Sequence, residues 1–241
     1  MNEVSHSLDA VAAATERLLT TASALNDAEA REPSLLPGWT RGHVLTHIAR
    51  NADGLGNLLR WARTGTEIPM YASIEARGAD IEAGAGRPAA DLAADVRESA
   101  SAFAAEAAAM PAEAWIEQVR ALHGPAFPAF GVLDRRRSEV EIHHVDLAAG
   151  YSPGDWPDDF LVEALPRVAE SFAGRDDAPR CLIWAEGAKD SLRIGADQAG
   201  APLVFVRGQP ADLLAWLLGR GDGSTLTMPA GATPPALPPW R

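Results

Sequence analysis

The chain has only one cysteine and no long apolar run, and each of these features excludes a class of protein. Its single cysteine, Cys181, cannot form an intramolecular disulfide and rules out a cysteine-rich zinc module. No segment approaches the ~18 consecutive apolar residues of a membrane span. Residues 1–10 include Glu3 and Asp9, and no basic patch precedes an apolar block, so no secretory signal is visible. We therefore expect a cytoplasmic protein with no membrane partner.

Positive charge is also scarce. The 21 basic residues are outnumbered by 33 acidic residues, which gives a formal charge of -12. Such a chain repels phosphate backbones, so nucleic acid is not expected as its main partner. The 47% hydrophobic and 22% charged residues are typical of a folded globular protein. Any metal site must be built from histidine and carboxylate side chains.

The first 150 residues show the hydrophobic spacing of helices. Thr40 is suited to cap one of them, and Gly150 is suited to end the last. The segment 67–88 contains Pro69 and several glycines, which predicts a loop with room for one short helix. The four long helices predict a bundle, the architecture in which metal ligands project inward from facing helices. Helices are expected over residues 3–25, 40–63, 89–110 and 130–150, with an irregular crossing over 111–128.

A change of pattern follows Gly150. Residues 151–158 contain two prolines and a glycine, which predicts a boundary between a helical domain, 1–150, and a second domain, 151–241. The second domain mixes helical segments with short alternating or apolar runs. We therefore predict an α+β two-domain protein. Helices are expected over 159–173 and 209–218, and strands over 181–185, 191–194, 202–206 and 225–228.

Four of the six histidines lie on two helices that are expected to face each other. Glu139 precedes His143 by four residues, so the carboxylate and the imidazole share one helix face. His43 or His47 from the other helix completes a set of two histidines and one carboxylate, which leaves a coordination position open. His144 points ~100° away from His143 around the helix. Spacing alone leaves both His43 and His47 open as the third ligand.

This pattern also has an ordinary interpretation. Glu-x-x-x-His pairs occur by chance on helices, where an exposed pair stabilises by only a few tenths of a kcal/mol. His6 and His123 have no partner at ligand spacing, and we expect no role for them.

Several motifs resemble those of the mycothiol-dependent maleylpyruvate isomerases, members of the DinB-like metalloenzyme superfamily. The matching segments are Gly-Trp-Thr-Arg-Gly-His at 38–43, Pro-Met-Tyr at 69–71, Arg-Ser-Glu-Val-Glu-Ile-His-His-Val-Asp-Leu at 137–147, Gly-Arg-Gly at 219–221 and the terminal Pro-Pro-Trp-Arg. The resemblance spans nearly the whole chain. The sequence departs from it at His144, where the family more usually has a small residue, which leaves His144 open either as a second imidazole beside the site or as an exposed residue.

The resemblance implies a DinB-like four-helix bundle followed by a small α+β domain, with zinc bound by His47, Glu139 and His143. It also implies that Arg220 serves the active site from the second domain. The sequence alone favours the interpretation of Arg220 as a solvated residue at a helix C-terminus. Arg41 and Arg77 are weaker candidates for anchoring substrate or thiol.

The implied reaction is the cis–trans isomerisation of maleylpyruvate to fumarylpyruvate, a step of gentisate-type aromatic degradation. Its partners are a small dicarboxylate substrate and the low-molecular-weight thiol mycothiol. The metal motif is shared with mycothiol S-transferases, which conjugate an electrophile and release the adduct. A third alternative is a non-catalytic metal-binding protein of the same fold.

Overall fold

The computed structural model describes residues 2–122, 124–197, 202–229 and 232–240. The chain divides into two compact units, Met1–Tyr151 and Ser152–Arg241. The first unit is almost entirely helical, and the second combines helices with a three-stranded sheet. The predicted α+β two-domain class is therefore confirmed. No helix among the described residues is both long and apolar enough to cross a membrane.

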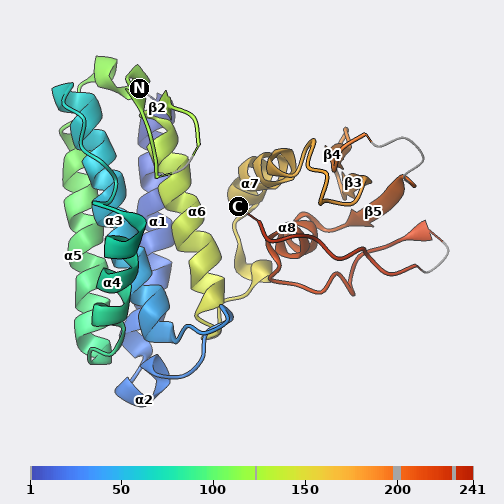
Figure 1. The fold of residues 1–241 in the computed structure, drawn as a ribbon. Helices are drawn as coiled ribbons and strands as arrows, with labels where there is room; N and C mark the ends of the chain where they lie inside the picture. Colours follow the sequence, from blue (N-terminus) through green and yellow to red (C-terminus); the bar gives the residue numbers. More distant parts are fainter. Residues whose placement is uncertain (1, 123, 198–201, 230–231, 241) are drawn as a thin grey trace. The chain divides into compact units, whose positions relative to one another are not determined.

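Four long helices form the bundle of the first unit (Figure 1). They are α1 (Asn2–Ala24), α3 (Arg41–Thr64), α5 (Ala89–Ala108) and α6 (Gly131–Asp146). Shorter elements connect them: α2 (Asp27–Ala30), α4 (Ile74–Ala85), η1 (Ala112–Ile116), β1 (Gln118–Val119) and β2 (Phe127–Pro128). The two short strands pair antiparallel, with Val119 opposite Phe127.

Helix α3 is the central element of this unit, because it packs against α4, α5 and α6. Thr40 caps its N-terminus as predicted, since its hydroxyl oxygen accepts the backbone N–H of His43. Gly65 ends it in the left-handed conformation at φ +69. Apolar side chains are buried on several faces of α3, among them Leu45, Ile48, Leu55, Leu58 and Leu59. Three polar side chains on this helix, Thr46, His47 and Asn51, are buried among them.

Helix α4 is the short helix for which the predicted loop over 67–88 left room, and it spans 12 residues. Its glycines lower the helix propensity of the segment, so the sequence does not give its bounds. Two contacts between α3 and α4 nevertheless require glycine. A Cβ on Gly42 of α3 would collide with the backbone oxygen of Ala85, and a Cβ on Gly84 would lie 2.5 Å from Thr46 Cγ2. The missing side chains therefore let α4 approach α3 closely.

Helix α6 ends at Asp146, four residues before the predicted end at Gly150. The backbone leaves the helical conformation at Ala148, whose φ is +49, and the carbonyls at this end find partners outside the helix. Arg41 donates from Nε to the Leu147 oxygen at 2.7 Å and from Nη2 to the Ala148 oxygen at 2.9 Å. Leu35 N–H donates to the oxygen of Asp146 at 2.9 Å. Arg41 thus closes the end of α6, a structural use of a residue considered as an anchor for substrate.

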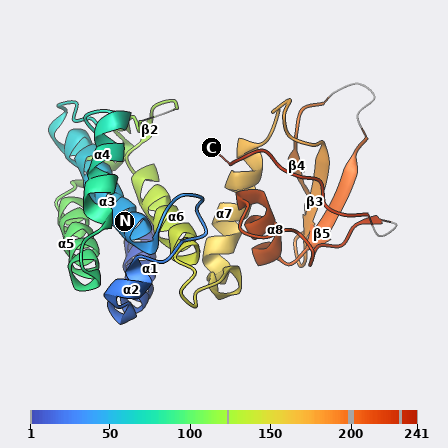
Figure 2. The same ribbon diagram turned by 60° about the horizontal axis from the view of Figure 1, so that its bottom comes forward.

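In the second unit, α7 (Asp158–Ser171) and α8 (Pro210–Leu218) cover one face of a sheet, as Figure 2 shows. The unit begins with the short helix η2 (Pro153–Asp155). The strands β3 (Cys181–Ala185), β4 (Leu192–Ile194) and β5 (Val204–Gly208) are ordered β4-β3-β5. Strand β3 is antiparallel to β4 and parallel to β5. Cys181 and Ile183 are buried, whereas Trp184 is exposed.

The predicted strand over 225–228 is wrong. Thr227 makes only an isolated bridge to Arg207 in the described part of this segment. Its backbone exchanges two hydrogen bonds with Arg207, at 3.0 and 2.7 Å. The predicted helices and the other three strands of this half are present. Strand β3 has the predicted bounds, whereas β5 begins at Val204 rather than Pro202.

Candidate metal centre

Helices α3 and α6 bring three metal-ligating side chains to one point. His47 Nε2 lies 3.0 Å from Glu139 Oε2 and 3.1 Å from His143 Nε2. His143 Nε2 lies 3.4 Å from the same Glu139 oxygen. No second group of three or more histidine, cysteine or acidic side chains converges in this way within the described ranges. Glu139 and His143 thus lie together on α6, as their spacing predicts. From α3 it is His47 rather than His43 that joins them.

The cluster is buried on the side of α3 and more open at its carboxylate. The side chain of His47 is 6% exposed, that of His143 16% and that of Glu139 32%. Trp39 lies edge-on against His47, with ring centroids 5.6 Å apart. The three ligand atoms therefore face a partly open position, which a small molecule can reach.

Two charged neighbours orient the histidine rings. The Nδ1 atom of His143 is 2.8 Å from Oδ2 of the fully buried Asp146, so its Nε2 is turned toward the cluster. A carboxylate in this position is the usual outer partner of a metal-binding histidine. The guanidinium of Arg77, on α4, donates from Nη2 to His47 Nδ1 at 3.0 Å. The close approach of α4 to α3 is what places Arg77 there.

The protonation states follow from these contacts. Burial lowers the pKa of His47 to about 4, in spite of its hydrogen bond to Glu139. Burial acts on His143 in the same direction, but the hydrogen bonds to Asp146 and Glu139 outweigh it and raise the pKa of His143 to about 9. Burial would raise the pKa of Glu139, yet its hydrogen bonds with both histidines hold that pKa well below its usual value. At neutral pH the cluster contains a carboxylate that accepts from two imidazoles.

Comparison with known proteins connects this geometry to a family. Residues 11–148 match the model of the mycothiol maleylpyruvate isomerase N-terminal domain. The whole chain is similar to the crystal structure of the mycothiol-dependent maleylpyruvate isomerase and to that of a variant of it with one histidine replaced by alanine. Each is 30% identical, with a TM-score of 0.88, and the match covers 98% of this chain and 97% of that one. This chain belongs to the mycothiol maleylpyruvate isomerase family. Among curated proteins there is no significant match.

The other histidines of this family member lie outside the cluster. His43 forms part of the α3 cap, where its Nδ1 accepts the Thr40 N–H at 3.1 Å, and its Nε2 faces Glu82 at 3.4 Å. His144 is buried rather than exposed, and its ring contacts lie away from the cluster. It stacks on Tyr151, with ring centroids 3.8 Å apart, and its Nε2 is 2.7 Å from the Thr21 hydroxyl. His6 makes no contact with the cluster, and His123 lies outside the described residues.

Arg220 lies in the second unit, directly after α8. Gly219 ends that helix at φ +72, and the Arg220 backbone N–H returns to the oxygen of Ala215 at 2.8 Å. Its Nη1 donates to the Leu218 oxygen at 2.6 Å. The side chain is half-buried and lines a cavity of about 550 Å³ together with Trp216, Asp222 and Trp240. Its role in the active site stays a prediction.

Sequence reasoning missed Asp146 as a functional residue and ranked Arg77 low. A signal for Asp146 existed, because it follows His143 by three residues and so shares its helix face. No such signal exists for Arg77, because the glycines around it weaken the helical pattern of its segment.

Proposed function

We propose that this chain is a zinc enzyme that isomerises maleylpyruvate to fumarylpyruvate with mycothiol as thiol cosubstrate. The metal site belongs to the bundle domain, 1–150, and residues 151–241 form the second domain of the isomerase type. The observation that carries the proposal is the convergence of His47, Glu139 and His143 in a member of this family. Membership of the family supports the reaction, and the cluster supports a metal site at which it occurs.

The residues present fit zinc. Tetrahedral zinc with Zn–N and Zn–O distances of ~2.0–2.1 Å requires ligand atoms ~3.3 Å apart. The three separations in the cluster, 3.0, 3.1 and 3.4 Å, are close to that value. Two nitrogens and one oxygen also leave the fourth position open, as in catalytic zinc sites. Bound zinc would supply a Lewis acid at which a thiol of pKa ~8.5 is converted to the nucleophilic thiolate at neutral pH.

The chain's own residues prepare this position. Asp146 fixes the His143 ring by holding its Nδ1 proton, which leaves Nε2 free to act as ligand. A His47 that binds through Nε2 carries its proton on Nδ1 and can no longer accept from Arg77. With the site occupied, Arg77 would therefore lose this acceptor, and its guanidinium would be available to an anionic substrate.

The proposed reaction conserves the thiol. The thiolate sulfur adds to one carbon of the cis double bond, and the electron pair of that bond moves into the adjacent carbonyl. The former double bond is now single and rotates. Expulsion of the thiolate then restores the double bond as trans, so no atom is gained or lost. The substrate is a dianion, and the planar guanidinium fork of Arg220 is suited to one of its carboxylates.

We place the reaction in the cytoplasm. We propose small molecules rather than nucleic acid as the partners, which the formal charge of -12 supports.

The test is to incubate the zinc-loaded protein with maleylpyruvate and mycothiol and to follow both by NMR. The proposal expects fumarylpyruvate to form while the thiol concentration stays constant. Accumulation of a thiol adduct without fumarylpyruvate would identify an S-transferase instead. No change in either compound would identify a non-catalytic metal-binding protein.

A further inference from the structure

Arg136 is a fully buried cation with unused hydrogen-bond donors. Its side chain is 0% exposed, and its Nη1 donates to the Ile48 oxygen at 2.8 Å and to Asn51 Oδ1 at 3.0 Å. The Nε and Nη2 donors are buried and have no partner. A buried donor without a partner is unfavourable, because it loses its hydrogen bonds to water on folding.

The charge of Arg136 is not neutralised by a direct contact either. Burial lowers the pKa of Arg136 to about 10, against the attraction of Glu139, Tyr71 and Asp53, so the group is still a cation at neutral pH. No acidic oxygen of the described residues lies within ion-pair distance of it. The guanidinium therefore has both a charge and two N–H groups to offer an anion.

The two unused donors are on one edge of the guanidinium. Nε and Nη2 point to the same side of the group, opposite the Nη1 atom that faces α3. This edge is the one with which arginine forms two parallel hydrogen bonds to a carboxylate. A single carboxylate would satisfy both donors and balance the charge.

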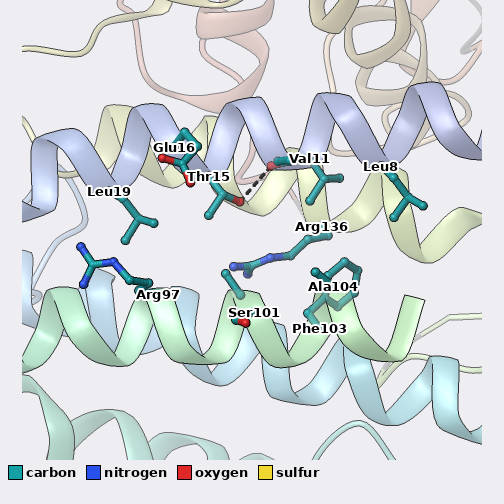
Figure 3. A pocket seen from close by; sticks show the side chains of 12 residues that line it. Leu8, Val11, Thr15, Glu16, Leu19, Arg97, Ser101, Phe103, Ala104 and Arg136 are labelled. Carbon is teal, nitrogen blue, oxygen red and sulfur yellow. Dashed lines mark hydrogen bonds between the residues drawn. The ribbon is translucent and has the colours of Figure 1, made fainter. Parts of the chain in front are cut away.

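A groove between α1 and α5 adjoins this side chain. Figure 3 shows Arg136 extending from α6 into the space between the two helices, with its guanidinium toward Ser101. The groove has a volume of about 230 Å³. Its wall is mainly apolar, and Thr15 is occupied by its own helix, since its hydroxyl donates to the Val11 oxygen at 2.8 Å. The apolar wall includes Leu8, Val11, Leu19, Phe103 and Ala104.

The geometry points to a binding site for a small aliphatic carboxylate, with its head on Nε and Nη2 of Arg136 and its chain along the groove. A cavity of 150 Å³ holds benzene, so this groove has room for roughly eight to ten non-hydrogen atoms. Hexanoate has eight. At the entrance, the exposed Glu16 and Arg97 carry opposite charges and favour neither sign. Selection for an anion thus rests on Arg136.

Calorimetric titration of the zinc-loaded protein with hexanoate and hexan-1-ol tests the inference. Hexanoate should bind at one site per chain and at least tenfold more tightly than hexanol, as expected for two charge-assisted hydrogen bonds. Arg136→Met should lose this preference, whereas Arg31→Met, which removes an exposed arginine elsewhere in the chain, should keep it. Equal binding of hexanoate and hexanol to the unmodified protein would overturn the site, and so would undiminished hexanoate binding to Arg136→Met.

A second variant separates the groove from the metal and covers a failure of Arg136→Met to fold. Ala104→Phe fills the groove from its exposed side and leaves Arg136 and the zinc ligands in place. It should weaken hexanoate binding at least tenfold while zinc content stays unchanged. Hexanoate that still binds Ala104→Phe with full affinity would be bound elsewhere, at the zinc or on the surface, and the inference would be wrong.

Discussion

Asp146 shows how a single buried carboxylate can determine what a metal ligand does. It is fully buried, and it holds His143 Nδ1 at 2.8 Å. We predict that Asp146→Asn weakens zinc binding about 10- to 100-fold, because a neutral amide holds the ring less firmly and lowers the basicity of Nε2. Competition with a chromophoric chelator measures the affinity.

The matched control is Asp9→Asn, which makes the same chemical change at an exposed position of α1. It should leave zinc affinity unchanged. An Asp146→Asn protein that is folded by circular dichroism and binds zinc as tightly as the unmodified chain would refute the role of Asp146.

The shifted pKa of His143 predicts how the stability of the metal-free protein depends on pH. Because the pKa of His143 is raised to about 9 from about 6.5 in the unfolded chain, its contribution is complete below pH 6.5 and is lost as pH rises to 9. The loss should be on the order of 1–3 kcal/mol. Urea unfolding of the chelated protein at pH 6.5 and 9 measures it. His143→Gln should reduce this decrease, and an equal decrease in both proteins would contradict the prediction.

At the residue scale, the sequence predicts the site as far as local spacing reaches. Glu139 and His143 share a helix face whatever the rest of the chain does. The choice between His43 and His47 depends on capping, since His43 is drawn into the bond with Thr40 at the start of α3. The two hydrogen-bond donors of Arg136 that have no partner result from the packing of the four helices. No local sequence pattern predicts them.

The close contact of α3 with α4 gives a prediction at the scale of elements. Gly42→Ala places a Cβ against the backbone oxygen of Ala85, which cannot move without moving α4. We expect a loss of about 1–3 kcal/mol in the free energy of unfolding, typical of overpacking. Zinc affinity should fall as well if α4 shifts. Urea denaturation and the chelator assay give the two numbers.

Gly78→Ala is the matched control on α4, because a Cβ there meets no atom within 4 Å. It should stabilise the protein by about 0.5–1 kcal/mol, the usual gain of alanine over glycine inside a helix. If both alanine variants changed stability in the same direction, the close contact would not explain the glycine at 42.

The same element shows where sequence reasoning stops. Gly84, which lets α4 pack against α3, also lowers the helix propensity of α4, so the sequence predicts a loop with room for a short helix and does not give its bounds. The end of α6 was misplaced for a related reason: Gly150 is a good local stop signal, but Arg41, 105 residues earlier than Asp146, supplies partners that end the helix sooner. Long-range partners decide such boundaries.

For the whole molecule, the question is whether the second unit takes part in catalysis. If Arg220 binds a substrate carboxylate, Arg220→Ala should lower kcat/KM about 10- to 100-fold, the effect of losing a charge-assisted hydrogen bond of ~1.5–3 kcal/mol. Arg220→Lys should restore part of it, because lysine keeps the charge but not the fork. Steady-state kinetics and zinc content of both variants are the measurements. Normal kinetics in Arg220→Ala would leave the second unit without a catalytic residue.

The two halves differ in how much of them could be foreseen. The apolar periodicity of the bundle is long and repeated, so α1, α3 and α5 were predicted nearly to their ends. The strands of the second unit are three to five residues long, too short for alternation to fix their ends, and Thr227 forms only one bridge.

The central claim is that His47, Glu139 and His143 hold a catalytic zinc. Its most direct test is to measure zinc content and isomerase activity on the same preparations of the unmodified protein, His47→Ala and Glu139→Gln. The controls are His43→Ala and Glu82→Gln, which change a neighbouring histidine and carboxylate outside the cluster. We expect about one zinc per chain, together with activity, in the unmodified protein and in both controls. We expect the zinc and the activity to be lost together in His47→Ala and in Glu139→Gln. Unchanged zinc content in His47→Ala and Glu139→Gln would contradict it.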